Sequence, residues 1–227
     1  MRTLLCALIL APAFLAGGCT KDSDADKNTE RKPPQLGPPA GKGDAGKAAA
    51  GSPGGFGPPN AVPAKDGKVV LNPENTQIKF VGTKPDGKHD GGFKAFTGTV
   101  ELDDKAAAPK AITLEIDTAS IYTDTGMLTN HLKTKDFFDV AKFPKATFTS
   151  TKIEPAAKEG TYQVTGKLTL HGETKEISFP ISPTIINSAL IGNSTFEIDR
   201  QDFGMTYGKG KVNDKVSISV VVGTAGQ

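Results

Sequence analysis

The sequence of 227 residues contains only two cysteines, Cys6 and Cys19, and no tryptophan. Residues 20–227 therefore contain no thiol. This excludes an internal disulfide, a cysteine nucleophile, cysteine-ligated zinc and thiol redox chemistry from any domain folded there. The motifs GxSxG and HExxH are absent as well, so no common serine-hydrolase or zinc-protease signature is present.

Strong charge and metal-binding spacings are also missing. The formal net charge is +2, and no basic run is interleaved with aromatic residues, so a nucleic-acid partner is not expected. The three histidines, His89, His131 and His171, have no second ligand residue at metal-binding spacing. We therefore expect no metal and no cofactor.

The first residues have the pattern of an export signal. Arg2 precedes an apolar run from Leu4 to Leu15, and small residues follow it, so residues 1–18 are predicted to be a signal peptide. The run of about a dozen residues is shorter than the roughly 20 that span a bilayer. The order LAGGC resembles the lipobox of bacterial lipoproteins, which implies lipidation of Cys19 and an N-terminal membrane anchor.

Composition then divides the chain. Residues 19–64 are rich in Gly, Pro, Ala, Lys and Asp and have few large apolar residues, so they are predicted to be a disordered tether that starts at the lipidated cysteine. Residues 65–224 form one predicted domain. About 160 residues can bury about 70% of the surface that the unfolded chain exposes, which is enough for a core without disulfides.

Alternation of apolar and polar residues dominates this domain. Apolar residues recur with a period of two around 69–71, 78–80, 96–102, 112–116, 148, 162–170, 177–181, 196–198 and 216–222. Such one-sided strands predict an all-β domain of about eight antiparallel strands around a shared interior. A two-layer sandwich and a closed barrel both satisfy the pattern.

Two stretches depart from the alternation. Residues 127–133 have helical spacing and predict a short helix, with a second helical piece at 136–140 before Pro144 turns the chain. This segment is typical of a lid on a barrel. Residues 82–92, with four glycines, a proline and two aspartates, are expected to form a mobile loop.

Five fragments, in this order, resemble the YceI-like family of bacterial polyisoprenoid-binding proteins. They are IKFVGTKPDGKHDGGFKAFTG, IDTASIYTD, HLKTKDFFDVAKFPKATFTS, GKLTLHGETKEISFP and IDRQDFGM, spread over about 150 residues. The resemblance implies a lipocalin-like barrel in the cell envelope whose apolar pore accepts a long isoprenoid chain. It also implies that the helical and aromatic segment shapes one end of the pore.

The apolar face of the strands and the lid is the candidate ligand site, although the same residues would equally form a filled core. The predicted lining consists of Phe80, Phe96, Val100, Ile112, Leu114, Ile116, Leu128, Leu132, Phe137, Phe138, Phe148, Val164, Leu168, Phe179, Phe196, Ile198 and Ile218.

Candidate contacts for a ligand head group are His131, Lys133 and Arg200. His131 is predicted either to reach a head group or to hold local structure. Arg200 either contacts an anion or forms an ion pair that fixes the turn at Phe203 and Gly204. His171, in a predicted hairpin turn, is expected to be structural.

The sequence thus predicts a protein that binds, sequesters or transports a long-chain isoprenoid or similar amphiphile, anchored in the bacterial envelope and facing the periplasm. Two alternatives stay open. One is an enzyme on a lipid-like substrate with His131 as acid or base and Arg200 as anion contact. The other is a filled scaffold barrel that binds an envelope protein. The oligomeric state is open, with a homodimer as one option.

Overall fold

The computed structural model describes residues 60–103, 105 and 107–223. The predicted signal peptide, Cys19 and nearly all of the predicted tether lie outside the described residues and stay predictions.

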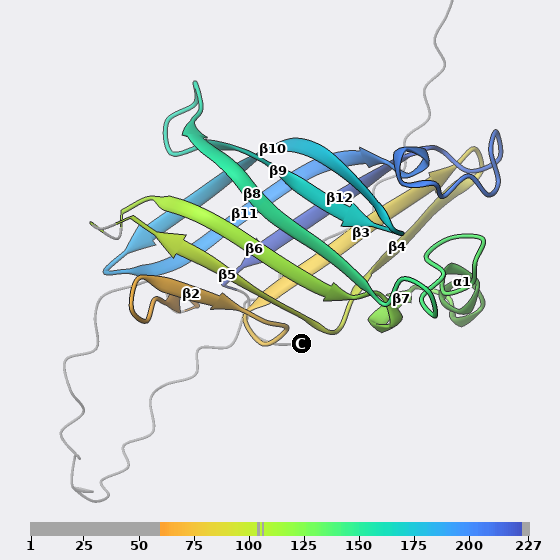
Figure 1. Cartoon of the computed structure of the whole chain (residues 1–227), viewed down its shortest axis with the longest axis horizontal. Helices are drawn as coiled ribbons and strands as arrows, with labels where there is room; N and C mark the ends of the chain where they lie inside the picture. Colours follow the sequence, from red (N-terminus) through yellow and green to blue (C-terminus); the bar gives the residue numbers. More distant parts are fainter. Residues whose placement is uncertain (1–59, 104, 106, 224–227) are drawn as a thin grey trace, which may run out of the picture. The chain divides into compact units, whose positions relative to one another are not determined.

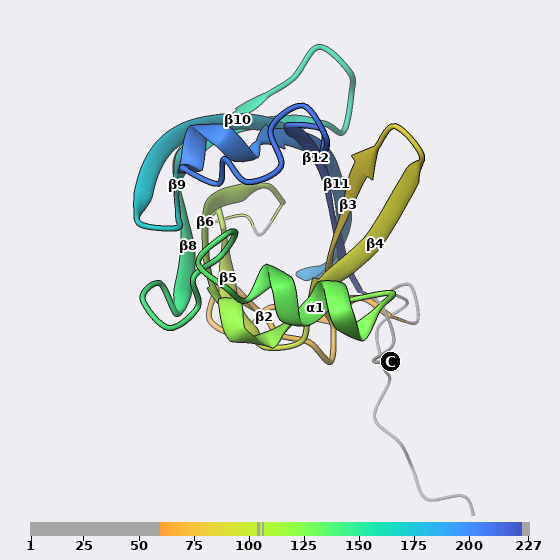
Figure 2. The ribbon, with the colours of Figure 1, turned by 90° about the vertical axis from the view of Figure 1, so that its right-hand side faces the viewer.

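Antiparallel strands make up most of the domain. They are β1 (Val62–Pro63), β2 (Lys68–Leu71), β3 (Thr76–Lys84), β4 (Gly87–Phe93), β5 (Phe96–Leu102), β6 (Pro109–Asp117), β7 (Ile121–Thr123), β8 (Lys145–Pro155), β9 (Tyr162–Leu170), β10 (Glu173–Ile186), β11 (Ala189–Asp199) and β12 (Lys215–Val222). All belong to one sheet with the order β2-β5-β6-β8-β9-β10-β11-β12-β3-β4-β7, and β1 pairs with β11. The sheet curls around a central axis (Figures 1 and 2).

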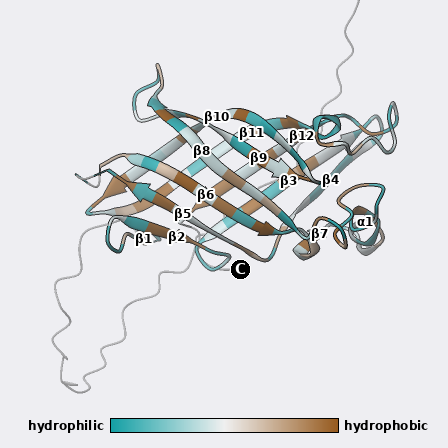
Figure 3. Cartoon of the chain, in the orientation of Figure 1, coloured by the Kyte–Doolittle hydropathy of each residue, from teal (hydrophilic) through white to brown (hydrophobic). Residues whose placement is uncertain are grey.

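This single curled sheet confirms the all-β barrel and excludes the two-layer sandwich. The described residues contain twelve strands, more than the predicted number of about eight. The strands without a counterpart among the predicted stretches are β1, β4 and β7, which lack the alternating pattern. Elsewhere the alternation is real: in β5, Phe96, Gly98, Val100 and Leu102 are buried and the residues between them are not. Figure 3 shows hydrophobic and hydrophilic residues alternating along the strands.

One α-helix lies beside this sheet, α1 (Gly126–Leu132), with two 3-10 turns, η1 (Thr118–Ser120) and η2 (Arg200–Phe203). Thr125 is the N-cap of this helix. Its backbone is extended, and its side-chain oxygen accepts a hydrogen bond from the Leu128 amide. The predicted helix at 127–133 is thereby confirmed within one residue. Within the described part of the chain, no helix has the length and apolarity needed to cross a bilayer.

The prediction of a mobile loop at residues 82–92 is wrong. β3 and β4 pair through this region as a hairpin, from Lys79 opposite Gly92 to Lys84 opposite Gly87. The glycines allow close packing there: a Cβ at Gly91 would collide with the Phe80 ring, and one at Gly92 would lie 2.6 Å from the Ile78 carbonyl oxygen. Glycine signals a loop when it is read alone, but here it permits close approach within a sheet.

The second helical piece, predicted at residues 136–140, is also wrong. The segment is a series of turns, in which the Phe138 amide donates to the Leu132 carbonyl oxygen and the Val140 amide to that of Lys133. Asp139 has φ of 42°, a left-handed conformation that interrupts any helix. The turns carry the chain back over the end of α1.

Different groups of residues lie at the two ends of the barrel. At one end, β1, β2, β5 and β11 contribute the plug cluster, defined here as Val62, Val69, Leu71, Val100, Leu102 and Leu190. At the other end, α1 and the turns after it form the lid segment, residues 124–144 (Figure 1). Figure 2 shows α1 crossing the lower part of the opening at this end.

Candidate functional site

An apolar cavity of about 530 Å³ occupies the barrel. It reaches from His131 and Tyr207 at the lid end to Leu71 and Leu190 in the plug cluster. Every second residue of β12 from Val216 to Val222 lines the cavity. At about 3.4 Å per residue, this lined part of the strand is about 20 Å long. The volume lies within the range of about 300–1,000 Å³ that is usual for ligand sites.

Most of the predicted lining residues lie on this cavity. They are Phe80, Val100, Ile112, Leu114, Ile116, Leu128, Leu132, Phe137, Phe138, Phe148, Leu168, Phe179, Phe196, Ile198 and Ile218. Phe96 and Val164 do not line it, since both are buried in the packing of the wall, and Val164 is fully buried against Phe148 and Phe179.

Several lining residues were missed by the sequence prediction. They include Leu71, Ile78, Phe93, Ala146, Leu170, Ile177, Ile181, Leu190, Met205, Tyr207, Val212, Val216, Val220 and Val222. Those on strands β9, β10 and β12 have the same alternation as the predicted set and could have been found from it. Met205, Tyr207 and Val212 come from a loop without periodicity, so the sequence held no signal for them.

Three phenylalanines form a continuous aromatic group in the middle of the cavity wall. The ring centroids of Phe148 and Phe179 are 5.3 Å apart, and Phe196 stacks on Phe179 at 4.3 Å. Gly166 provides the space for this group, because a Cβ there would lie 2.5 Å from Phe148 Cζ. The glycine thus lets the Phe148 ring lie close to the wall.

A second apolar group lies at the lid end. Ile121, Leu132 and Phe137 are buried there, with Phe80, Phe93, Leu128 and Phe138 packed against them. The placement agrees with the prediction that the helical and aromatic segment covers one end of the barrel. Its side chains come from the lid segment, from the β3–β4 hairpin and, for Ile121, from β7.

His131 lies at this end and lines the cavity. Its Nε2 lies 3.0 Å from Asp136 Oδ2. Its ring meets those of Phe137 and Tyr207 edge-on, with centroids 5.2 and 5.0 Å away. The histidine therefore organises the lid and is also accessible from the cavity.

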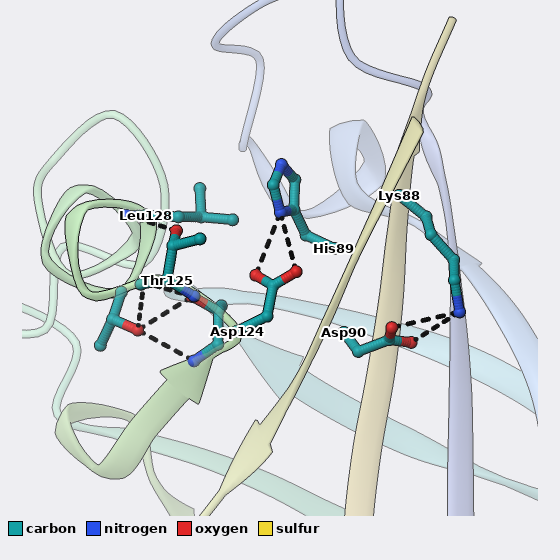
Figure 4. A network of polar contacts seen from close by, with 8 residues as sticks. Lys88, His89, Asp90, Asp124, Thr125 and Leu128 are labelled. Carbon is teal, nitrogen blue, oxygen red and sulfur yellow. Dashed lines mark hydrogen bonds and ion pairs between the residues drawn. The ribbon is translucent and has the colours of Figure 1, made fainter. Parts of the chain in front are cut away.

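His89 also lines the cavity, on the neighbouring strand β4. Its Nδ1 lies 3.0 and 3.2 Å from the two carboxylate oxygens of Asp124, the residue that precedes the helix N-cap (Figure 4). Beside it, Lys88 pairs with Asp90 on the same strand. The His89–Asp124 contact joins β4 to the lid segment, an arrangement that sequence spacing could not reveal because the two residues are far apart in the chain.

The head-group role predicted for Arg200 is wrong. This arginine is 4% exposed, and all five of its N–H groups have partners inside the protein. They donate to the carbonyl oxygens of Met205, Tyr207, Val212 and Asn213 and to the Asp214 carboxylate. Arg200 therefore holds the mouth loop, residues 204–214, in place. The structural alternative fits, with Asp214 as the ion-pair partner.

The predictions for Lys133 and His171 have different outcomes. Lys133 caps the C-terminus of α1 and does not line the cavity, so its predicted contact with a head group has no support in this arrangement. His171 occupies the β9–β10 turn with φ of 52°, and its Nδ1 lies 3.0 Å from the Phe203 carbonyl oxygen. Its structural role is confirmed.

No cluster suited to metal binding occurs among the described residues, since no three His, Cys, Asp or Glu side chains converge there. His131 and Arg200, the residues named for the enzyme alternative, both line the cavity, but Arg200 has no free donor for an anion. The geometry is that of an apolar container with a polar rim.

Comparison with protein families matches residues 70–223 to the YceI-like domain. The chain is 35% identical over 145 residues to a UPF0312 protein of Pseudomonas syringae pv. syringae, covering 57% of this chain and 70% of that protein. It is 32% identical over 145 residues to Protein YceI of Salmonella newport, covering 58% and 71%.

Solved structures show the same fold. The crystal structure of BcnA from Burkholderia cenocepacia has a TM-score of 0.59 and 29% identity, covering 65% of this chain and 94% of that one. A polyisoprenoid binding domain from Saccharophagus degradans has a TM-score of 0.56 and covers 70% and 97%. At 16% identity the second likeness shows the fold alone.

Proposed function

The chain belongs to the YceI-like family, and from this premise we propose that its domain binds, sequesters or carries a long-chain isoprenoid or a similar amphiphilic lipid. One observation carries the proposal, the apolar cavity that extends along the barrel from the lid segment to the plug cluster. A filled scaffold would have no such cavity.

The binding energy would come from burial of the lipid chain. Each methylene moved from water into an apolar site contributes about 0.8 kcal/mol, so a few isoprene units suffice for useful affinity. Because such burial has no direction, we expect poor discrimination between lipids of similar length. The structural neighbour from Saccharophagus degradans, described as a polyisoprenoid binding domain, supports this ligand class.

We propose binding without catalysis. The cavity wall is aliphatic and aromatic through its middle, the Ser194 hydroxyl donates to a main-chain oxygen, and each imidazole at the lid end has one nitrogen engaged with an aspartate. An enzyme on a lipid would need a nucleophile or an acid–base pair near the bound chain. Turnover of an extracted lipid by the purified protein would contradict this part of the proposal.

The proposed location is the cell envelope, with the domain facing the periplasm. Support comes only from the sequence: the export signal at residues 1–18, the candidate lipidation site Cys19 and the tether at 19–64. Metabolic labelling with a radioactive fatty acid, compared with a Cys19→Ala variant, tests the anchor. Label on the wild type alone is expected.

Native mass spectrometry of the purified protein tests the binding function. We expect one long-chain lipid per chain, which organic extraction removes. Ile218→Trp places a large side chain inside the cavity and should abolish retention, whereas Ser219→Trp, on the adjacent residue outside the cavity lining, should keep it. Melting curves of both variants verify that they are folded.

Two outcomes would overturn the proposal. A protein that never retains or takes up a long-chain lipid is not a lipid carrier. Equal lipid retention by the two tryptophan variants would show that the lipid binds outside the barrel.

A further inference from the structure

The polar side chains that line the cavity are unevenly placed. In its interior, the Ser194 hydroxyl donates to the Pro180 carbonyl oxygen and the Thr76 hydroxyl to the Asn75 side chain, so both are satisfied within the protein. His89 and His131 lie at the lid end. A ligand with one polar end would therefore place that end under the lid and its chain toward the plug cluster, since an unpaired polar group in the apolar interior is costly.

The imidazole of His89 has one engaged and one free nitrogen. Its Nδ1 faces the Asp124 carboxylate, whereas Nε2 has no hydrogen-bond partner among the residues that the structure describes. Figure 4 shows the second nitrogen on the side of the ring away from the carboxylate. The ring is one-third exposed and lines the cavity.

His131 repeats this arrangement with the nitrogens exchanged. Nε2 faces Asp136, and Nδ1 has no hydrogen-bond partner in the described part of the chain. The edge-on contacts with Phe137 and Tyr207 fix the orientation of the ring. Two independently held imidazoles thus line the lid end of one cavity.

A carboxylate partner decides which nitrogen of a neutral imidazole carries the proton. Carboxylate oxygens only accept hydrogen bonds, so the proton lies on the nitrogen that faces the aspartate, and the other nitrogen keeps its lone pair. The same orientation effect is known from carboxylate–histidine pairs around metals. The free nitrogens of His89 and His131 are therefore hydrogen-bond acceptors.

We propose that the lid end of the cavity is a head-group site for an uncharged hydrogen-bond donor, a hydroxyl or primary amide at the end of the apolar chain, with His89 and His131 as acceptors. This inference rests on the proposed lipid-binding function and specifies its ligand class. Arg200 also lines the cavity, but all of its N–H donors are used and its charge is paired with Asp214, so it has no free donor for a ligand. The exposed Lys84, which also lines the cavity, is the group that would instead favour an anionic head.

Three probes with the same chain separate these cases: a C20 prenol, its methyl ether and its monophosphate. Each displaces a fluorescent long-chain probe from the full, delipidated protein at pH 8. We expect the prenol to bind about two- to ten-fold more tightly than the ether, the ratio that one ordinary hydrogen bond produces, and the monophosphate to bind no more tightly than the prenol. Equal binding of prenol and ether, or tighter binding of the monophosphate, would overturn the head-group inference.

Variants then identify the acceptor. In the double variant His89→Phe and His131→Phe, the prenol and the ether should bind equally, while His89→Gln combined with His131→Gln, whose side chains offer a carbonyl oxygen, should restore part of the preference. Retention of ether binding verifies that a variant has an intact cavity. A preference for the prenol that persists in the double phenylalanine variant would contradict the assignment of these two residues.

The failure of this inference is distinct from that of the proposed function. If none of the three probes displaces the fluorescent lipid and the lipid itself does not bind, both proposals fail. If prenol and ether bind equally well, lipid binding stands and only the head-group site is lost.

Discussion

The end of the barrel with the plug cluster and the end with the lid segment are built from different side chains. The plug cluster consists of six aliphatic residues, each less than 9% exposed, from four strands. The lid end combines a short helix, a series of turns, aromatic rings and two histidine–aspartate contacts. Apolar side chains pack at both ends, but only at the plug end do they all come from strands of the sheet.

This difference suggests that the plug end contributes mainly to the stability of the fold and the lid end to the access of a lipid to the cavity. Close-packed aliphatic strands resist local opening, whereas turns and exposed polar contacts open at lower free energy. We therefore expect substitutions at the plug end to change the free energy of unfolding, and those at the lid end to change the rates of lipid entry and exit as well. Four substitutions test this division, from the largest expected effect to the smallest.

Val69→Asp should have the largest effect. Val69 is fully buried in the plug cluster, so a carboxylate there would lack both solvent and a partner, and we expect a loss of about 3 to 5 kcal/mol in the free energy of unfolding. Urea unfolding followed by circular dichroism measures it. The matched control is Val70→Asp on the next, 53% exposed residue, which should change stability by less than about 0.5 kcal/mol. Similar losses in the two variants would refute the role of the plug cluster.

Arg200→Lys should come second and should also affect the lid end. A lysine has three donors and no planar fork, so main-chain carbonyl oxygens of the mouth loop lose their partners, at a cost of about 2 to 4 kcal/mol. We expect faster lipid release as well, measured by transfer of a fluorescent lipid to vesicles. The exposed Lys209→Ala in the same loop is the control. If release is unchanged in Arg200→Lys, the arginine does not govern access.

Gly166→Ala tests the region between the two ends. The new Cβ would collide with the Phe148 ring and the Thr149 carbonyl oxygen, so the ring must move, and we expect a cost of about 1 to 3 kcal/mol with a reduced capacity for long chains. Gly82→Ala is the control, because nothing lies within 4 Å of its added Cβ. Unfolding curves and displacement assays with lipids of increasing length measure both effects. Unchanged chain-length preference would show that the Phe148 ring does not bound the cavity.

Glu101→Gln should have the smallest effect, at the plug end. Lys68 and Glu101 face each other across β2 and β5 at 2.8 Å, and this hydrogen bond lowers the pKa of Glu101 and raises the pKa of Lys68. Because the Glu101 pKa is depressed, Glu101 stabilises the folded state above about pH 4.3, and this stabilisation is lost as the pH falls further. Because the Lys68 pKa is raised, Lys68 stabilises the folded state below about pH 10.4, and this stabilisation is lost at higher pH. The pair is exposed, so the effect is small and weakens with salt.

Melting temperatures of wild type and Glu101→Gln, compared between pH 3 and pH 8, measure this contribution. The difference should be present at pH 8 and vanish at pH 3. Glu74→Gln, in the exposed turn before β3, should show no such difference. A constant difference at both pH values would assign the effect to something other than the ion pair.

Some features of the fold and of the cavity could be predicted from the sequence and others could not, because they have different physical origins. Periodic residues such as Val100, Ile112 and Phe196 were placed on the cavity because strand geometry alone decides which face a residue occupies. The hairpin at residues 82–92 was missed because Gly91 and Gly92 permit close contacts with Phe80 on the paired strand and with Tyr122 on β7, which local sequence does not reveal. Tyr207 was missed because its loop is held by Arg200 and not by local propensity.

By itself, the amino-acid sequence determined the class of fold, the short lid helix and the family resemblance, since all of these depend on local periodicity and on the order of motifs along the chain. Only the tertiary structure decided that the barrel contains a cavity, that Arg200 is fully engaged, and that His89 lies beside Asp124. The reason is that packing volume and hydrogen-bond partners depend on which residues meet in space. His89 and Asp124 are 35 positions apart, and no spacing rule joins them.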